Sequence, residues 1–128
     1  MIKQLKLVAV LTGLLFLLGS FQKDGILPTN LQVTVVDDAG NIQIGASVKL
    51  YKTEEDYKND KNAIKAQSKT NKKGRVIFKK LDTKVYWVRA QKGDLTNDDH
   101  GIKTSKLEKG RLNRINIVLS GLSIAPIR

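Results

Sequence analysis

The sequence contains no cysteine among its 128 residues. Disulfides, thiolate metal sites, cysteine nucleophiles and thioether-linked lipid anchors are therefore excluded. Histidine, methionine and tryptophan occur once each, which leaves little material for catalysis. Acidic residues are also scarce, because 12 Asp and Glu stand against 23 Lys and Arg, giving a formal net charge of +11. That charge favours contact with polyanions but says nothing about the fold.

The first twenty residues have the pattern of a secretory signal peptide. Lys3 and Lys6 precede an uninterrupted apolar run at residues 7–18, and a basic start followed by roughly 7–15 apolar residues directs export. A membrane-spanning helix needs about 20 apolar residues, so this run is short for one. The alternative is a buried N-terminal helix. We predict a signal peptide at residues 1–20 and a protein exported to the periplasm or the cell surface.

The residues around the predicted cleavage site resemble a bacterial lipobox without its cysteine. Residues 17–20 (LLGS) lead up to the position of the lipid-bearing residue, which here is Phe21. Phe21 has no thiol to acylate, so lipid anchoring at this position is excluded. Residues 21–30 contain Gly25 and Pro28 and lack periodicity, which predicts a linker.

Residues 31–119 consist of short alternating segments separated by turn residues, as is typical of an all-β sandwich. We expect a short helix at residues 53–59, because Thr53 can cap it and acidic residues follow. Residues 91–101 are expected to form a polar loop. The expected strands lie near residues 31–35, 46–50, 64–68, 76–78, 86–90, 102–107 (the weakest) and 112–119. Seven strands in roughly 90 residues favour a seven-stranded antiparallel β-sandwich, followed by a C-terminal tail at 120–128.

Several segments occur in an order that is found in a known group of domains. They are residues 33–40, 45–50, 70–78, Leu81 and 86–90. Together they resemble the carboxypeptidase regulatory-like and collagen-adhesin B-type (Cna-B-like) domains, which share the prealbumin-like (transthyretin-like) seven-stranded sandwich. The resemblance covers residues 31–119 and implies that Phe78, Leu81 and Tyr86 fill the core. The leader, the linker and the acidic short helix resemble small exported proteins of the Bacteroidetes.

The resemblance also implies two chemistries whose residues are missing. Some adhesin B-type domains carry a Lys–Asn or Lys–Asp isopeptide cross-link promoted by a buried Glu. The corresponding residue here is Ala90, and Val35 and Val36 stand where the reactive lysine would be, so we expect no cross-link. The urate-pathway hydrolases of the transthyretin superfamily depend on several histidines. This chain has only His100, so we expect no such activity.

Oxygen ligands concentrate in one segment, which makes it the candidate metal site. Calcium takes about six to eight hard oxygen ligands in loose geometry. The alternative is a plain exposed loop, since Asp, Asn and Gly are ordinary turn residues and the spacing matches no known calcium loop. We expect no other cofactor. The candidate ligands, beside His100, are Asp94, Asn97, Asp98 and Asp99.

A second segment concentrates positive charge. On a hairpin these side chains would form one basic corner, able to meet phosphate or sulfate groups on lipopolysaccharide or glycans. Nucleic acid is not expected as a partner of an exported chain. The alternative is a solvated edge, where lysines discourage aggregation. The six residues are Lys69, Lys72, Lys73, Arg75, Lys79 and Lys80.

Trp87 is the remaining candidate for binding. If Tyr86, Val88 and Ala90 point into the core, then Trp87 and Arg89 lie on the outer face of the same strand. An indole beside a guanidinium can stack on a sugar or anchor a protein. Alternatively, the helix after Leu50 or a lysine stem covers the indole. The candidate ligand-binding residues are Trp87 and Arg89, with Arg75 and Lys79 as outlying charges.

Two functional hypotheses follow from the sequence. The first is an exported, non-enzymatic β-sandwich module that binds a protein, an anionic glycan or another envelope component. The second is a structural spacer or accessory subunit of an envelope complex with no ligand of its own. An enzyme has little support, because a single histidine supplies no nucleophile, base and orienting group.

Overall fold

The computed structural model describes residues 27–64 and 68–121. The predicted signal peptide, most of the predicted linker and nearly all of the predicted tail lie outside these residues. Within the described part of the chain, no helix is long and apolar enough to cross a membrane.

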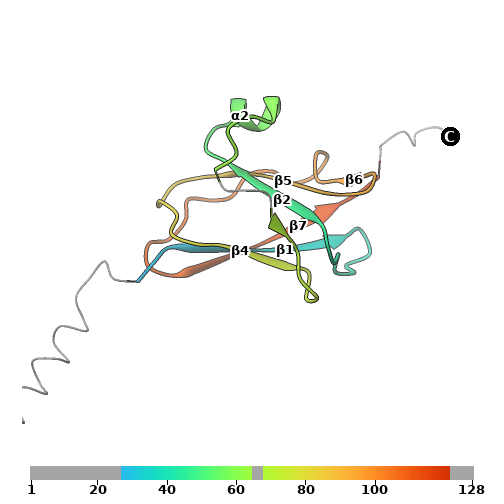
Figure 1. Cartoon of the computed structure of the whole chain (residues 1–128), viewed down its shortest axis with the longest axis horizontal. Coiled ribbons are helices and arrows are strands. Elements are labelled where there is room, and N and C mark those ends of the chain that lie inside the picture. Colours follow the sequence, from blue (N-terminus) through green and yellow to red (C-terminus); the bar gives the residue numbers. More distant parts are fainter. Residues whose placement is uncertain (1–26, 65–67, 122–128) are drawn as a thin grey trace, which may run out of the picture.

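The described residues form seven strands and one short helix. They build two packed sheets, one with strand order β4-β1-β7 and the other with order β3-β2-β5-β6, called here the β1 sheet and the β2 sheet. Helix α2 lies over the β2 sheet, on the side away from the β1 sheet (Figure 1). The predicted β-sandwich with a helix after the second strand is confirmed. The elements are β1 (Asn30–Asp37), β2 (Ser47–Tyr51), α2 (Glu54–Asn59), β3 (Ser68–Lys69), β4 (Arg75–Phe78), β5 (Trp87–Lys92), β6 (Leu95–Thr96) and β7 (Leu112–Leu119).

The core lies between the sheets and follows the period of two predicted for the strands. Alternate residues of β1, β2 and β5 are almost completely buried, and Phe78 and Leu81 join them. Burial of each aliphatic side chain of this size stabilises the fold by roughly 1.5–3 kcal/mol. The buried residues of these three strands, with Tyr86 just before β5, are Leu31, Val33, Val35, Val48, Leu50, Tyr86, Val88 and Ala90.

One pair of strands does not run as expected. β1 and β7 pair in parallel over eight residues, from Asn30 opposite Leu112 to Asp37 opposite Leu119, whereas the sequence analysis expected only antiparallel neighbours. Parallel neighbours need a long crossover connection. Here all five remaining strands, β2 to β6, lie between β1 and β7 in the chain, so the connection between β1 and β7 passes through the β2 sheet.

The sixth strand is also displaced from its predicted position. Strand β6 lies at Leu95–Thr96, inside the predicted polar loop, because a turn at Gly93 (φ +61°) folds it back onto β5. Residues 102–107 form no strand and make only an isolated bridge, Trp87 with Lys103. The predicted strand at 102–107 is therefore wrong, although that segment does lie against the same edge of β5.

The third strand is shorter than predicted in the part that can be compared. β3 is Ser68–Lys69, and residues 65–67 of the predicted strand lie outside the described residues. The turn between β3 and β4 is confirmed, since the Gly74 N–H donates to the Asn71 carbonyl at 2.9 Å. Gly74 has a φ of +73°, and a Cβ there would lie 2.9 Å from the Ile42 Cβ.

Candidate functional site

Helix α2 is positioned by contacts at both ends and on its buried face. The Thr53 hydroxyl accepts a 3.0 Å hydrogen bond from the Asp56 N–H, and Asp60 ends the helix in the left-handed conformation. On the buried face, the Tyr57 ring meets the Tyr51 ring edge-on, with 5.8 Å between centroids. Tyr51 belongs to the outer face of the β2 sheet, so the helix covers part of that face.

Arg89 projects from the outer face of β5 as predicted, but its guanidinium is already occupied. It lies 4.2 Å from the centroid of the Tyr57 ring. It donates to the Tyr57 carbonyl and, at 3.4 Å, to the Asp98 carboxylate. The Tyr57 hydroxyl donates to the same carboxylate at 2.6 Å. Arg89 therefore holds helix α2 and the loop after β6 against the sheet.

Trp87 lies on the same outer face, opposite Tyr51 in the register of β2 and β5. Its side chain is half-buried, and the Lys103 ammonium lies 5.5 Å from the ring centroid. A neighbouring lysine therefore lies over the indole, which is one of the two ways of covering it that the sequence left open.

The outlying charges of the predicted patch lie elsewhere. Arg75 belongs to β4 and Lys79 follows it, and β4 is part of the β1 sheet, whereas Trp87 and Arg89 belong to the β2 sheet. The outer faces of the two sheets of a sandwich point in opposite directions. The four residues thus do not form one patch.

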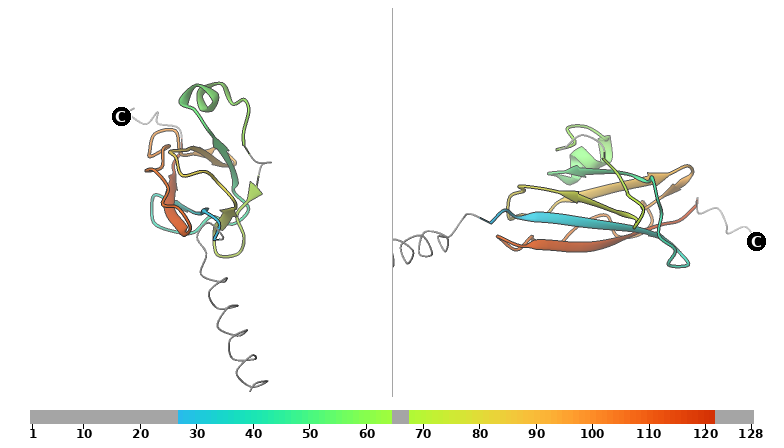
Figure 2. Two further views of the ribbon diagram at one scale, coloured as in Figure 1. Left: turned by 90° about the vertical axis from the view of Figure 1, so that its left-hand side faces the viewer. Right: turned by 60° about the horizontal axis from the view of Figure 1, so that its bottom comes forward.

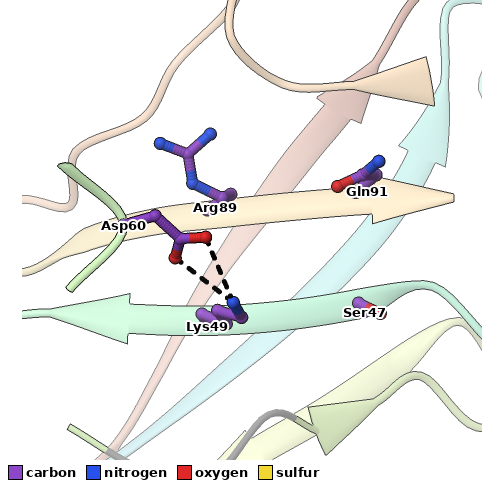
Figure 3. Close-up of a pocket in the computed structure, with 5 residues that line it drawn as sticks. All are labelled: Ser47, Lys49, Asp60, Arg89 and Gln91. Atoms are coloured by element: carbon purple, nitrogen blue, oxygen red, sulfur yellow. Dashed lines mark hydrogen bonds and ion pairs between the residues drawn. The ribbon is translucent and has the colours of Figure 1, made fainter. Parts of the chain in front are cut away.

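A small hollow of about 100 Å³ opens beside Arg89 (Figure 3). The Lys49 ammonium points towards the Asp60 carboxylate across it, at 3.2 Å. The Tyr51 hydroxyl donates to the same carboxylate. The lining residues are Ser47, Lys49, Asp60, Arg89 and Gln91.

The ionisable groups at this hollow are engaged by their neighbours: Asp60 by Lys49 and Tyr51, and Arg89 by Asp98. The hydrogen bond from Tyr51, followed by the contacts with Lys49, holds the pKa of Asp60 below its ordinary value. Burial, reinforced by Asp60, raises the pKa of Tyr51 to about 12. A neutral phenol and an ion pair offer neither a nucleophile nor a base near neutral pH. The arrangement fixes α2 to β2.

The candidate metal ligands of residues 94–99 have different surroundings. Asn97 is completely buried. Its carboxamide oxygen accepts from the Ala90 N–H at 2.9 Å, and its amide group donates to the Val88 carbonyl at 2.8 Å. Asp98 is engaged by Tyr57 and Arg89, while Asp94 and Asp99 are exposed. The described residues contain no group of three or more His, Asp or Glu side chains that could hold a metal ion.

His100 lies between Ser120 and Asp38, which are far from it in the sequence. Its Nε2 is 3.1 Å from the Ser120 hydroxyl and 3.5 Å from the Asp38 carboxylate. A serine-hydrolase relay needs the serine and the aspartate on different ring nitrogens. Because both contacts use Nε2, this cluster links loops and does not form a relay.

The six cations of the basic segment are all exposed, and within residues 27–64 and 68–121 none of them forms an ion pair. Their exposure agrees with both alternatives drawn from the sequence.

The buried positions that matter for an isopeptide bond are apolar. Val35 lies opposite Ile117 in the β1–β7 pair, and Ala90 is completely buried.

The fold is similar to those of two pilins and of a further bacterial protein. A streptococcal ancillary pilin gives a TM-score of 0.58 at 17% identity, over 78% of this chain and 34% of the pilin. GBS52, the minor pilin of Streptococcus agalactiae, gives 0.55 at 14% identity, over 80% and 48%. The Bacillus anthracis TIE protein gives 0.54 at 18% identity, over 75% and 18%.

These likenesses agree with the Cna-B-like fold of the sequence resemblance, and at such identities they concern the fold alone. This chain spans less than half the length of each of the three proteins. No protein-family model matches the sequence, and no curated protein matches it.

Proposed function

We propose that this chain is an exported, non-enzymatic β-sandwich module that serves as an accessory subunit of an envelope or surface assembly, held there by another protein. The observation that carries the proposal is the sandwich fold shared with an ancillary and a minor pilin. The predicted signal peptide supports export. We also propose that the chain is related to small exported Bacteroidetes proteins and to carboxypeptidase regulatory-like domains, which its sequence resembles.

The chemistry of the described residues supports a structural role. Arg89, Asp98 and Tyr57 contact one another, and Tyr51 and Lys49 contact Asp60. His100 contacts Ser120 and Asp38 through a single nitrogen. Side chains in contacts of this kind hold parts of a protein together and do not make or break covalent bonds.

Cell fractionation tests the proposal. The full chain with a C-terminal tag is produced in the cells that encode it, and envelope fractions are separated by size under native conditions. We expect the chain in the envelope, in particles much larger than the free chain, whose mass is 14.2 kDa before the signal peptide is removed and without the tag. Retention in the cytoplasm, or an envelope pool that is entirely monomeric, would contradict the proposal.

A second candidate function is favoured by the half-exposed indole of Trp87. With Lys103 beside it, the ring can stack on an anionic sugar while the ammonium meets the acid group. A glycan array tests this candidate, with Trp87→Ala as the matched variant. Signals lost in the variant support it, and a wild-type chain that binds no glycan contradicts it.

A further inference from the structure

The outer face of the β1 sheet is a surface that no described helix covers. Helix α2 contacts β2 and β5, on the opposite side of the sandwich. When the molecule is turned so that the β1 sheet comes forward, β4, β1 and β7 lie side by side with no helix over them (Figure 2, right). We call this surface the bare face. Gln32, on the central strand, is itself buried between its neighbours. The residues on this side of the sheet are Gln32, Thr34, Val36, Ile42, Arg75, Ile77, Arg114, Asn116 and Val118.

The strand register arranges these side chains in three rows, because residues directly opposite each other share a face of the sheet. One row joins Ile77, Gln32 and Arg114, and the next joins Arg75, Thr34 and Asn116. The last row joins Ile42, Val36 and Val118. Each of the first two rows contains one arginine, and the last row is wholly apolar.

The bare face exposes large apolar side chains beside its arginines. Ile77 keeps 44% of its surface exposed and Ile42 keeps 46%. Together with the half-buried Val36 and Val118, these isoleucines give the face an apolar surface that a partner could cover. Arginine among apolar residues is typical of protein–protein interfaces, where arginine is enriched and lysine is depleted.

The charge of the bare face has one sign. It contains two arginines and no acidic residue, and among the described residues neither arginine forms an ion pair. The arginine of the opposite sheet, Arg89, is by contrast paired with Asp98. Arg75 and Arg114 lie in adjacent rows on the two strands that flank β1, and these strands are two strand spacings, or about 10 Å, apart. Lys72 and Lys73 extend the positive charge beyond the end of β4.

We propose that the bare face is the docking surface for an acidic protein partner, whose apolar side chains cover Ile42 and Ile77 and whose carboxylates pair with Arg75 and Arg114. This inference rests on the proposed function and names the surface through which the assembly would hold the chain. A second copy docking through the same face would oppose arginine to arginine. A sugar chain would find no aromatic ring on this face to stack against.

Photo-crosslinking in the producing cells tests the proposal on the full chain. One strain carries p-benzoylphenylalanine in place of Asn116, at the exposed centre of β7, and another carries it in place of Lys92, exposed on β5. We expect a protein adduct at position 116 and none at position 92. The partner peptide joined to position 116 should be rich in Asp and Glu.

Charge variants then separate this face from general electrostatic attraction. Arg75→Glu with Arg114→Glu should lower the adduct yield about tenfold or more, because the bare face would then carry the same negative charge as the acidic partner and repel it. Lys52→Glu with Lys61→Glu makes the same change of net charge on exposed residues beside α2 and should leave the yield unchanged. Circular dichroism and thermal unfolding check that both double variants fold. The milder pair Arg75→Gln and Arg114→Gln replaces the first if it does not.

Other outcomes would overturn the inference. An adduct at position 92 alone places the contact on the other sheet, and an adduct between two copies of the chain makes the partner a second copy. Heparin binding by the purified chain that Arg75→Glu with Arg114→Glu abolishes, without any protein adduct, makes the face a glycan site. If fractionation finds the chain in large envelope particles but neither position crosslinks, this inference fails while the proposed function stands.

Discussion

The Tyr57 hydroxyl donates a 2.6 Å hydrogen bond to the Asp98 carboxylate, across 41 residues of sequence. The same carboxylate receives Arg89, whose guanidinium lies over the Tyr57 ring. An isolated helix of six residues is not stable in water. The position of α2 therefore depends on this three-residue cluster and on the Asp60 contacts at its C-terminal end.

Tyr57→Phe should destabilise the fold by about 1 kcal/mol, since it removes one hydrogen bond to a charged group and keeps the ring beneath Arg89. Denaturant unfolding measures the difference in the free energy of unfolding. Asp99→Asn is the matched control, because Asp99 is exposed in the same loop, and it should change little. Equal stability of Tyr57→Phe and the wild type would show that the bond does not fix α2.

Asn97 takes the place of a strand along the edge of β5. β6 pairs with the C-terminal end of β5, and Ile102 and Thr104 bond to its N-terminal end. Between them, the Asn97 carboxamide bonds to the Ala90 N–H and the Val88 carbonyl, as a backbone would. The same amide group also donates to the Gly101 carbonyl at 3.3 Å.

Asn97→Ala should therefore cost about 3 kcal/mol, because it leaves buried backbone groups of Ala90 and Val88 without partners. Thermal and denaturant unfolding measure the loss. Asp94→Ala, in the turn before β6, is the control and is expected to cost little.

We also expect calcium to leave the melting temperature unchanged. Calcium-dependent protection of the wild type that Asp94→Ala removes would show that the loop holds a metal ion.

The sequence was sufficient for features that depend on local pattern. The alternation of β1, β2 and β5, the cap at Thr53 and the turn before Gly74 each follow from a few neighbouring residues. Seven strands and the inward direction of Tyr86, Val88 and Ala90 were predicted for that reason.

Features that depend on distant partners were not predicted. The parallel β1–β7 pair and the hydrogen bond between Tyr57 and Asp98 join residues that are far apart in the chain. The burial of Asn97 depends on hydrogen bonds between its side chain and the backbone of β5. An Asn among aspartates and glycine looks like an exposed turn, and only the edge of β5 gives it a buried role. Arg89 was placed on the correct face, but its partners on α2 were not visible in the sequence.

The tyrosines should titrate at unusually high pH in the folded protein. The pKa values of Tyr51, Tyr57 and Tyr86 are all raised, chiefly by burial, and that of Tyr51 is raised to about 12. A pKa above the unfolded value means that folding favours the neutral phenol. The stabilisation is complete below pH 10 and is lost as the pH rises from about 10 towards 12 and beyond.

Phenolate absorbance measures this titration. We expect the native chain to titrate above the denatured chain, and the free energy of unfolding to fall in the same alkaline range. Asp60→Asn should lower the pKa of Tyr51, because the carboxylate contributes to raising it. Tyrosines that all titrate near pH 10 in the native chain would contradict the burial of their hydroxyl groups.

No isopeptide bond should be present in the exported chain. The core positions that would need a lysine and a promoting carboxylate hold Val35 and Ala90, both completely buried. The intact mass should equal the sum of the residues that remain after export. A mass lower by one ammonia or one water would show that a cross-link had formed elsewhere.

Trp87 is the only tryptophan of the chain, so its fluorescence reports this one site. Its ring is half-buried beside Lys103, whereas Tyr86 next to it is 1% exposed. Trp87→Ala should therefore cost at most about 2 kcal/mol of stability, against roughly 3–5 kcal/mol for Tyr86→Ala. Acrylamide, a neutral quencher, should quench the wild-type fluorescence partially, and more strongly after Lys103→Ala removes the side chain that lies over the ring. If a glycan binds here, Trp87→Ala should weaken binding by about 2 kcal/mol or more. A stability loss as large as that of Tyr86→Ala would make the indole a core residue and remove Trp87 as a binding site.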